Sequence, residues 1–334
     1  MKIATYNVEW FDRLFNDDGL MINDESWSGR RDVPRGAQIT ALGDVFQAMD
    51  ADGIMVIEAP DSSRKRDGGQ ALETFARHFG LRANRVEIGF VNDTQQEISF
   101  LYDPQTLTVA HDPQASPEAP SFAAKLKLDV DVDGMPETIT WSKPPLELAV
   151  QTGGGKTLRL IGVHAKSKAP HGARNDNDVM RLSIANRRKQ LAQCVWLRRR
   201  VEAHLEAGDT LMVMGDFNDG PGLDEYEKLF GRSGIEVVLG EDTGLQLYDP
   251  HARMALGKRM AAAPTSARFK VPPDGRFLTA LLDYIMVSAN LKGSNPAWRI
   301  WHPFEDPECF ADPALQKALL TASDHFPVMV TFDD

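Results

Sequence analysis

Cysteine is scarce in this chain of 334 residues, which contains only Cys194 and Cys309. Two cysteines cannot supply a disulfide framework, so a reduced, cytoplasmic setting is the simplest expectation. The chain also lacks any run of about 18 apolar residues, the length that a membrane-spanning helix needs, and no such span is expected. The N-terminal segment 1–7 is strand-like and polar at its end, which argues against a cleavable signal peptide.

Positive charge is also in deficit, because the formal net charge is −11. This excess of acidic residues argues against a protein coated in basic surface for binding polyanions. It does not exclude a nuclease, since a metal site needs clustered carboxylates and a few basic loops can still hold phosphates. The apolar fraction of 42% is typical of a globular protein with a substantial core.

Short polar clusters follow apolar, strand-like runs at several places along the chain. A carboxylate beside so much aliphatic surface is costly unless it is paired or bound to a cation. Several of them therefore indicate one shared site around a metal ion, as in a phosphoester hydrolase. The clusters are Thr5-Tyr6-Asn7, Glu58 after 54–57, Gly215-Asp216-Phe217-Asn218, Asp283 within 281–287, and Ser323-Asp324-His325.

Each cluster has a chemical interpretation and a plainer one. Asp216 could orient and deprotonate a water molecule, and Asn218 could hold that water or a phosphate oxygen; the alternative is an ordinary Asp/Asn turn after a strand. Asp324 offers a hard oxygen ligand that suits Mg²⁺, and His325 could stabilise developing charge on phosphate. A buried Asp283 needs a partner, and we expect it to fix the tautomer of His325.

His164 ends the apolar run 158–163 and could bind the scissile phosphate or protonate the leaving oxygen, although a lone histidine at a strand end is more often structural. Basic residues gather in three loops that each follow a candidate site residue, and such loops would focus positive potential on a phosphate. These loops contain Arg30/Arg31/Arg35, Arg64/Lys65/Arg66, and Lys166/Lys168 with Arg174; we expect Lys166, Arg64 and Arg174 to bind substrate. The basic stretches 187–189 and 198–200 are instead interpreted as the solvated face of a helix.

Strands and helices are mixed without regular βαβ alternation, which favours sheets with helices packed outside them. Residues 1–334 are expected to form one domain, with loop insertions near 10–35, 165–177 and 251–275. Apolar spacing predicts helices over 37–49, 68–79, 178–206 and 223–230. Strands are predicted over 2–8, 54–57, 98–102, 125–132, 147–150, 158–163, 211–214, 283–287 and 328–332.

Taken in order, the clusters resemble the endonuclease/exonuclease/phosphatase superfamily, which includes DNase I-like nucleases. The matching segments span nearly the whole chain: 5–10, Glu58, 162–164, 214–219, 282–288 and 323–325. The resemblance implies an α/β (α+β) fold, a four-layer αββα sandwich of two mainly antiparallel sheets flanked by helices. It also implies Mg²⁺, or else Mn²⁺, held by Glu58 with help from Asn7 and Asp324. Asp216 and Asn218 would position the attacking water or bind a second metal ion, and His164 and His325 would contact phosphate.

Two departures from the family pattern stand out. The family usually has Gln before its metal-binding Glu, whereas Ile57 precedes Glu58 here. A Glu supports the first histidine in DNase I-like members, and either Gln96 or Glu97 falls near that position.

From the clusters and the resemblance together, we expect a Mg²⁺-dependent phosphodiesterase acting on nucleic acid. The alternatives are an enzyme for a small phosphoester, such as a nucleotide, lipid or sugar phosphate, and a non-catalytic binding module.

Overall fold

The computed structural model describes residues 1–30, 32–92, 94–129, 136–170, 172–220, 230–241, 243–257, 263–271 and 275–334. The strands are β1 (Lys2–Asn7), β2 (Gly53–Ala59), β3 (Arg85–Ile88), β4 (Glu97–Tyr102), β5 (Leu107–His111), β6 (Leu126–Leu128), β7 (Glu137–Ile139), β8 (Leu146–Thr152), β9 (Thr157–His164), β10 (Leu211–Asp216), β11 (Ala267–Val271), β12 (Arg276–Ala280), β13 (Asp283–Val287), β14 (Ala297–Ile300) and β15 (Val328–Thr331). The helices are η1 (Phe11–Leu14), α1 (Arg35–Met49), α2 (Gly68–His78), α3 (Asp176–Glu206), α5 (Gly234–Leu239), α6 (Pro250–Leu256), α7 (Ala289–Lys292), α8 (Pro307–Ala311) and α9 (Pro313–Ala322).

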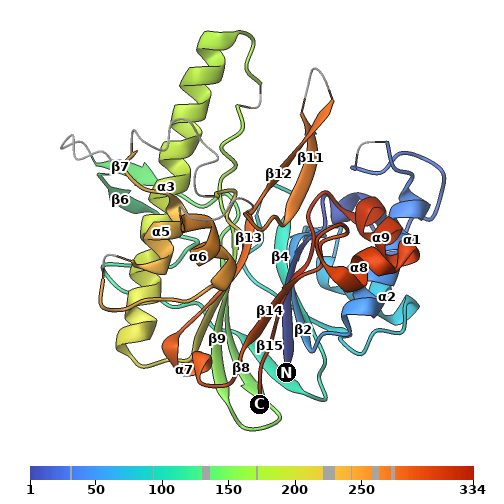
Figure 1. Cartoon of the computed structure of the whole chain (residues 1–334), viewed down its shortest axis with the longest axis horizontal. Coiled ribbons are helices and arrows are strands. Elements are labelled where there is room, and N and C mark those ends of the chain that lie inside the picture. The colour runs from blue at the N-terminus through green and yellow to red at the C-terminus, as the bar shows by residue number, and fades with distance from the viewer. Residues whose placement is uncertain are drawn as a thin grey trace.

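Two large sheets form the centre of the molecule. Sheet I has the strand order β14-β15-β1-β2-β4-β3, and sheet II has the order β13-β10-β9-β8-β5. Neighbouring strands are antiparallel except for the parallel pairs β1–β2 and β9–β10. Helices α1, α2, α8 and α9 lie outside sheet I, and α3, α5 and α6 lie outside sheet II (Figure 1). The expected four-layer αββα sandwich is therefore confirmed.

The alternation of side chains along each strand explains these layers. Ile3 on β1 joins the apolar core between the sheets, whereas Ala4 and Tyr6 join the core under α1, α2 and α9. On β10, Met214 likewise faces the other sheet and Val213 packs under α3. Because both faces of these strands are buried, their sequences read as nearly continuous apolar runs.

The long helix α3 confirms one prediction and corrects another. It agrees closely with the helix predicted over 178–206, and its buried positions include Leu191 and Cys194. The expected solvated basic face is wrong, because Arg187, Arg198 and Arg200 are buried. Each guanidinium finds carboxylate or carbonyl acceptors; the guanidinium of Arg200, for example, lies 3.0 Å from a carboxylate oxygen of Glu147 and donates to three backbone carbonyls. Burial is tolerated because these acceptors replace water.

The expected loop insertions have more structure than their sequences suggest. Segment 10–35 contains the short helix η1, and segment 251–275 contributes most of α6 and strand β11. Strands β11 and β12 form a hairpin that projects from the end of the molecule opposite the two termini (Figure 1). The helix predicted over 223–230 falls almost wholly outside the described residues, as does the second half of the strand predicted over 125–132. None of the described helices is both long and apolar enough to cross a bilayer.

Candidate active site

Strand register brings most of the predicted site residues to one place. Asp216, the last residue of β10, stands opposite His164 on β9 and opposite Asp283 on β13. In sheet I, Asn7 ends β1 opposite Ile57, the residue before Glu58. Parallel neighbouring strands end at the same edge of a sheet, so these polar ends converge.

These strand ends line one cleft of about 480 Å³. The lining residues are Asn7, Glu9, Trp10, Glu58, Gln96, Ser142, Lys143, His164, Ala165, Lys166, Ser167, Asp216, Asn218, Asp324 and His325. The cleft therefore contains every predicted metal ligand, and of the predicted catalytic residues it omits only Asp283, which lies behind His325.

Unusual backbone conformations set the direction of two of these strand ends. Glu58 has a φ of 60° where the pairing of β2 with β4 shifts register between Ile57 and Ala59. Such a bulge redirects a side chain that a regular strand would place elsewhere. Gly215 has a φ of 135°, and a Cβ there would lie 2.0 Å from the carbonyl oxygen of Val163. Only glycine fits between β9 and β10 at this position, immediately before Asp216.

The Asp216 carboxylate is buried and held by amide donors. The side-chain nitrogens of Asn7 and Asn218 donate to Oδ2 at 3.0 Å and 3.1 Å, and the Asn218 backbone N–H donates to Oδ1 at 2.7 Å. Burial raises the pKa of Asp216 to about 7, although the charge of His325 opposes that rise. A carboxylate with such a pKa exchanges protons readily near neutral pH.

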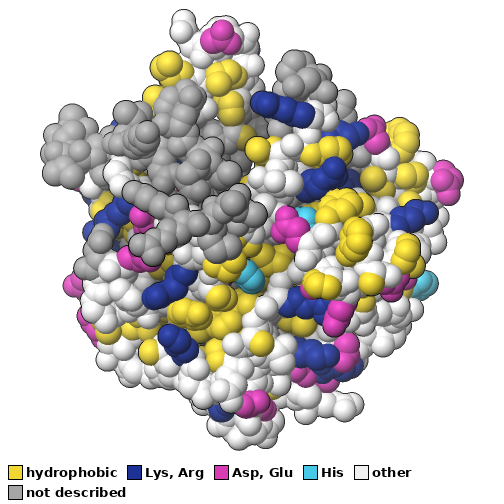
Figure 2. Space-filling view, in the orientation of Figure 1, with side chains coloured by type: hydrophobic (Ala, Val, Ile, Leu, Met, Phe, Trp, Pro, Cys, Tyr) yellow, Lys and Arg dark blue, Asp and Glu magenta, His cyan; other side chains and the backbone are white. Residues whose placement is uncertain are grey.

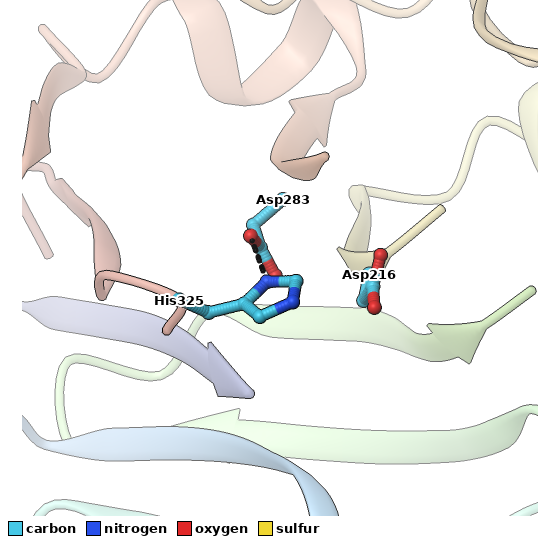
Figure 3. Close-up of side chains that lie close together, drawn as sticks. All are labelled: Asp216, Asp283 and His325. Carbon is cyan, nitrogen blue, oxygen red and sulfur yellow. Dashed lines mark hydrogen bonds and ion pairs between the residues drawn. The ribbon is translucent and has the colours of Figure 1, made fainter. Parts of the chain in front are cut away.

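Asp283 fixes the orientation of His325, as the sequence suggested. Its Oδ2 lies 2.7 Å from Nδ1 of His325 and accepts a second hydrogen bond from Ser266 Oγ at 2.8 Å. Figure 3 shows the imidazole between Asp283 and Asp216, with its other nitrogen on the side of Asp216. Burial disfavours the charged imidazole, but the carboxylates of Asp283, Asp216 and Asp324 together outweigh it and raise the pKa of His325 well above its usual value. His325 is therefore protonated at neutral pH.

His164 has the opposite electrostatic character. Burial and the charges of Lys143 and His325 hold its pKa well below the usual value, so His164 is neutral. Its Nε2 lies 3.7 Å from Asp216 Oδ2 and 3.9 Å from Glu58 Oε1. The two histidines of the cleft thus differ in charge although both are buried.

Lys143 is a cleft residue that sequence reasoning missed. Its Nζ lies 3.1 Å from each ring nitrogen of His164, and its charge acts on the carboxylates of Glu58 and Asp216. Burial lowers the pKa of Lys143, and those two carboxylates oppose the shift. The only local signal was a basic residue before Pro144-Pro145, just ahead of strand β8.

Glu9 is a second missed residue. It forms an ion pair with Arg30, and one of its carboxylate oxygens accepts the backbone N–H of Asp324 at 3.3 Å. Burial and the neighbouring Asp324 carboxylate raise the pKa of Glu9 to about 7. Glu9 stands two residues after Asn7, so its proximity to the predicted ligand was the available signal.

The donor set of the cleft fits a hard divalent cation. Glu9, Glu58, Asp216 and Asp324 bring four carboxylates together, and burial raises the pKa of Glu58 as it does that of Asp216. Carboxylate and amide oxygens are the ligands that Mg²⁺ prefers. Within the part of the chain that the structure describes, Asp216, Asp283 and His325 also offer ligand atoms within 4.8 Å of one another. In that group, Oδ2 of Asp283 is already occupied by His325 and Ser266.

The predicted substrate-binding residues are not all in the cleft. Lys166 lines it, whereas Arg64 lines a separate hollow with Asp17 and Ser62, and Arg174 is an exposed residue outside both. Substrate binding by these three residues stays a prediction. Of the two residues proposed to support His164, Gln96 reaches the cleft. Glu97 instead accepts two hydrogen bonds from Asn92.

A buried ion cluster lies directly behind the cleft. Asp219 accepts hydrogen bonds from Lys168 Nζ at 2.5 Å, Arg187 Nη1 at 2.9 Å and the Gly234 backbone N–H at 2.5 Å. The positive partners outweigh burial and lower the pKa of Asp219. The cluster joins the loop after β9, the loop after β10 and helices α3 and α5, so it anchors the backbone that carries Lys166 and Asn218.

Comparison with known proteins agrees with this architecture. The Endonuclease/Exonuclease/phosphatase family model matches residues 4–325. No significant match was found among curated protein sequences. Among solved structures, an AP endonuclease from Archaeoglobus fulgidus aligns with a TM-score of 0.54 at 12% identity, covering 100% of both chains. A 3′ phosphatase from Neisseria bound to a product DNA hairpin gives 0.51 at 14%, again covering 100% of both chains. D. rerio TDP2 complexed with a single-strand DNA product gives 0.51 at 12%, covering 100% of this chain and 99% of that one.

These structural likenesses establish the fold, and the family model extends over nearly the whole chain, including all the strand ends that form the cleft. The chain belongs to the endonuclease/exonuclease/phosphatase family and is a metal-dependent phosphoric ester hydrolase.

Proposed function

We propose that this hydrolase is a Mg²⁺-dependent phosphodiesterase whose substrate is nucleic acid. The observation that carries the proposal is the convergence, in one cleft, of amide and carboxylate oxygens with two imidazoles and two lysines. The acidic groups suit a cation and a water molecule, and the basic groups suit a phosphate. A site with both halves is what phosphodiester hydrolysis requires.

Glu58 would be the principal metal ligand, with Asn7 and Asp324 beside it and Asp216 and Asn218 nearby. Mg²⁺ is the expected ion and Mn²⁺ the alternative, because both take oxygen ligands. When bound, the ion would neutralise negative charge on the phosphoryl and leaving oxygens.

In this proposal, Asp216 accepts the proton of the attacking water. Its pKa of about 7 matches that task near neutral pH. The amides of Asn7 and Asn218 hold its carboxylate in place, and this fixed direction lowers the cost of orienting the water.

The basic side chains act on the phosphate. The protonated His325 places a positive charge beside Asp216, where the transition state gains negative charge. Neutral His164 can donate one hydrogen bond to a phosphate oxygen or to the leaving oxygen. Lys143 and Lys166 add positive charge to the same cleft.

A small-molecule phosphoester is the second candidate substrate. The net charge of −11 and a cleft of only about 480 Å³ favour it. Salt separates the two candidates, because binding of a polyanion weakens steeply with salt through counterion release, and binding of a small ester responds far less.

A non-catalytic binding module is the third candidate, and metal-dependent turnover would exclude it. The expectations of a single domain and of a cytoplasmic location stay predictions.

A plasmid-nicking assay with Mg²⁺ tests the proposal. Wild-type protein should convert supercoiled DNA to nicked or linear forms, and Asp216→Ala should reduce the rate by several orders of magnitude. Inertness of the wild-type protein toward DNA, RNA and bis(p-nitrophenyl) phosphate would remove the proposal. Turnover of the small ester without turnover of nucleic acid would favour the second candidate.

A further inference from the structure

A second hollow of about 490 Å³ lies between the N-terminal half of α3 and strand β7. It is lined by Glu137, Thr138, Ile139, Thr140, Arg181, Ile184, Ala185, Arg188 and Lys189. This hollow is the α3 groove. Three of its lining residues are basic and one, Glu137, is acidic.

The charge of the α3 groove contrasts with that of the whole chain. Glu137 forms an ion pair with Arg188 at 3.2 Å, and Arg181 contacts Asp178 at 3.3 Å on the exposed side of the helix. Lys189 adds a further positive charge to the same wall. On the face of the molecule shown in Figure 2, Lys and Arg side chains are dispersed in small groups. Arg181, Arg188 and Lys189 with their two acidic partners leave a net charge of +1 at the groove, whereas the whole chain carries −11.

The α3 groove is a direct neighbour of the catalytic cleft. The segment 138–143 forms a wall of both, because Thr138 and Thr140 line the groove while Ser142 and Lys143 line the cleft. Hydrogen bonds fix this shared wall. Gln193 of α3 accepts the backbone N–H of Lys166 at 2.9 Å and donates to the Thr140 carbonyl at 3.1 Å.

The basic side chains follow one another from the cleft into the groove. Lys166 lines the cleft, and its backbone N–H donates to Gln193 of α3, which stands four residues after Lys189 of the groove. Burial lowers the pKa of Lys166, and the charge of Lys189 lowers it further. Burial also lowers the pKa of Lys143, and the charge of Lys166 lowers it further, whereas the carboxylates of Glu58 and Asp216 raise it. Lys143, Lys166, Lys189 and Arg181 therefore mark a path that starts beside the candidate scissile phosphate and leaves along α3.

We propose that the α3 groove binds the sugar–phosphate backbone of the nucleic acid that flanks the cleavage site. This inference rests on the proposed function and adds to it a binding site outside the catalytic cleft. A small phosphoester held in the cleft would not extend into the groove, whereas a polynucleotide continues past the scissile phosphate. Spaced cations along the path match the regular charges of such a backbone, and Ile139, Ile184 and Thr138 provide a surface for the sugars.

The double substitution Arg181→Gln/Lys189→Gln removes two groove charges. The matched control, Lys292→Gln/Lys317→Gln, removes two exposed charges on α7 and α9, away from the groove (Figure 1). Binding of a fluorescent DNA duplex is measured by anisotropy in EDTA, so that affinity is read without turnover. Circular dichroism and urea unfolding confirm that both variants fold.

Each neutralised phosphate contributes about 0.9 to the slope of log affinity against log salt, so the groove variant should lose about 1.8 of that slope. From 50 to 200 mM salt, wild-type affinity should therefore fall about tenfold more than that of the groove variant. The control should keep the wild-type slope and affinity. Equal slopes for groove variant, control and wild type would overturn the groove proposal.

The proposed function is judged separately, by Mg²⁺-dependent cleavage of DNA by the wild-type protein. Cleavage together with an unchanged groove-variant slope would refute the groove while leaving the nuclease proposal intact. Absence of cleavage would refute the nuclease proposal, whatever the groove variant does in the binding assay. A slope that falls in the groove variant only, together with cleavage, supports both.

Discussion

Replacing Asp283 with Asn tests the electrostatic role assigned to His325. The substitution keeps the shape of the side chain and its place beside Ser266 but removes the negative charge that faces Nδ1 of His325 at 2.7 Å. If the delocalised charges are taken as about 4 Å apart, their attraction at an effective dielectric constant of about 20 is about 4 kcal/mol. Loss of that attraction disfavours the protonated imidazole, so the pKa of His325 should fall in the variant.

The expected consequence is a neutral His325 at pH 7.5. Burial, which already disfavours the charged imidazole, is then opposed by the carboxylates of Asp216 and Asp324 without that of Asp283, so the pKa of His325 should fall. Loss of a fixed positive charge beside the phosphate should reduce kcat by about 10²- to 10³-fold. NMR titration of the His325 ring reports the pKa, and hydrolysis of bis(p-nitrophenyl) phosphate reports kcat.

Asp249→Asn is the matched control. Asp249 is another buried carboxylate in the same half of the molecule, where it caps α6 and accepts the backbone N–H of Ile285, outside the cleft. This variant should lose stability without changing the pKa of His325. The reasoning is refuted if Asp283→Asn leaves the pKa of His325 unchanged, or if kcat falls by less than about tenfold despite the shift.

Three further predictions concern other parts of the chain. Asp219→Asn removes the charge that Arg187 contacts at 2.9 Å, so the free energy of unfolding in urea should fall by about 3 kcal/mol, and a loss below about 1 kcal/mol would contradict the burial argument. Burial lowers the pKa of His302 to about 4, so the unfolded chain binds more protons than the folded protein between pH 6.5 and 4. The free energy of unfolding should therefore fall by about 2 kcal/mol as the pH is lowered from 6.5 to 4. His302→Gln should lessen this fall, as measured by urea unfolding at pH 6.5 and at pH 4. Unchanged pH dependence in that variant would exclude His302 as a cause. Glu58→Gln should weaken Mg²⁺ binding at least tenfold in calorimetric titration, and equal affinity would show that Glu58 is not the principal ligand.

The strand-end residues could be predicted because their local sequences carry the signal. Glu58 follows a four-residue apolar run, and Asp216 and Asp283 stand at the ends of buried strands. Burying a carboxylate there is costly unless a partner replaces its contacts with water. A carboxylate in such a setting indicates a shared site even before its partner is known. The order of these clusters along the chain then identified the family and with it the four layers.

Residues whose partners lie far away in sequence could not be predicted in this way. Arg187 looked like part of a solvated basic run, but its carboxylate partner Asp219 lies 32 residues later. Lys143 stands before a strand, not at the end of one, and reaches His164 only because β8 and β9 pair. The β11–β12 hairpin was equally hidden, since its strands are short and β12 exposes Phe277 and Leu278 instead of burying them.

The central claim is that side chains from strands of both sheets form one divalent-cation site for phosphoester hydrolysis. The most direct measurement is turnover on a panel of DNA, RNA and bis(p-nitrophenyl) phosphate, with Mg²⁺, with EDTA, and with Mg²⁺ restored in excess. The account predicts hydrolysis of nucleic acid that EDTA abolishes and added Mg²⁺ or Mn²⁺ restores. Hydrolysis that persists in EDTA, or no hydrolysis of any of the three substrates with either metal, would contradict it.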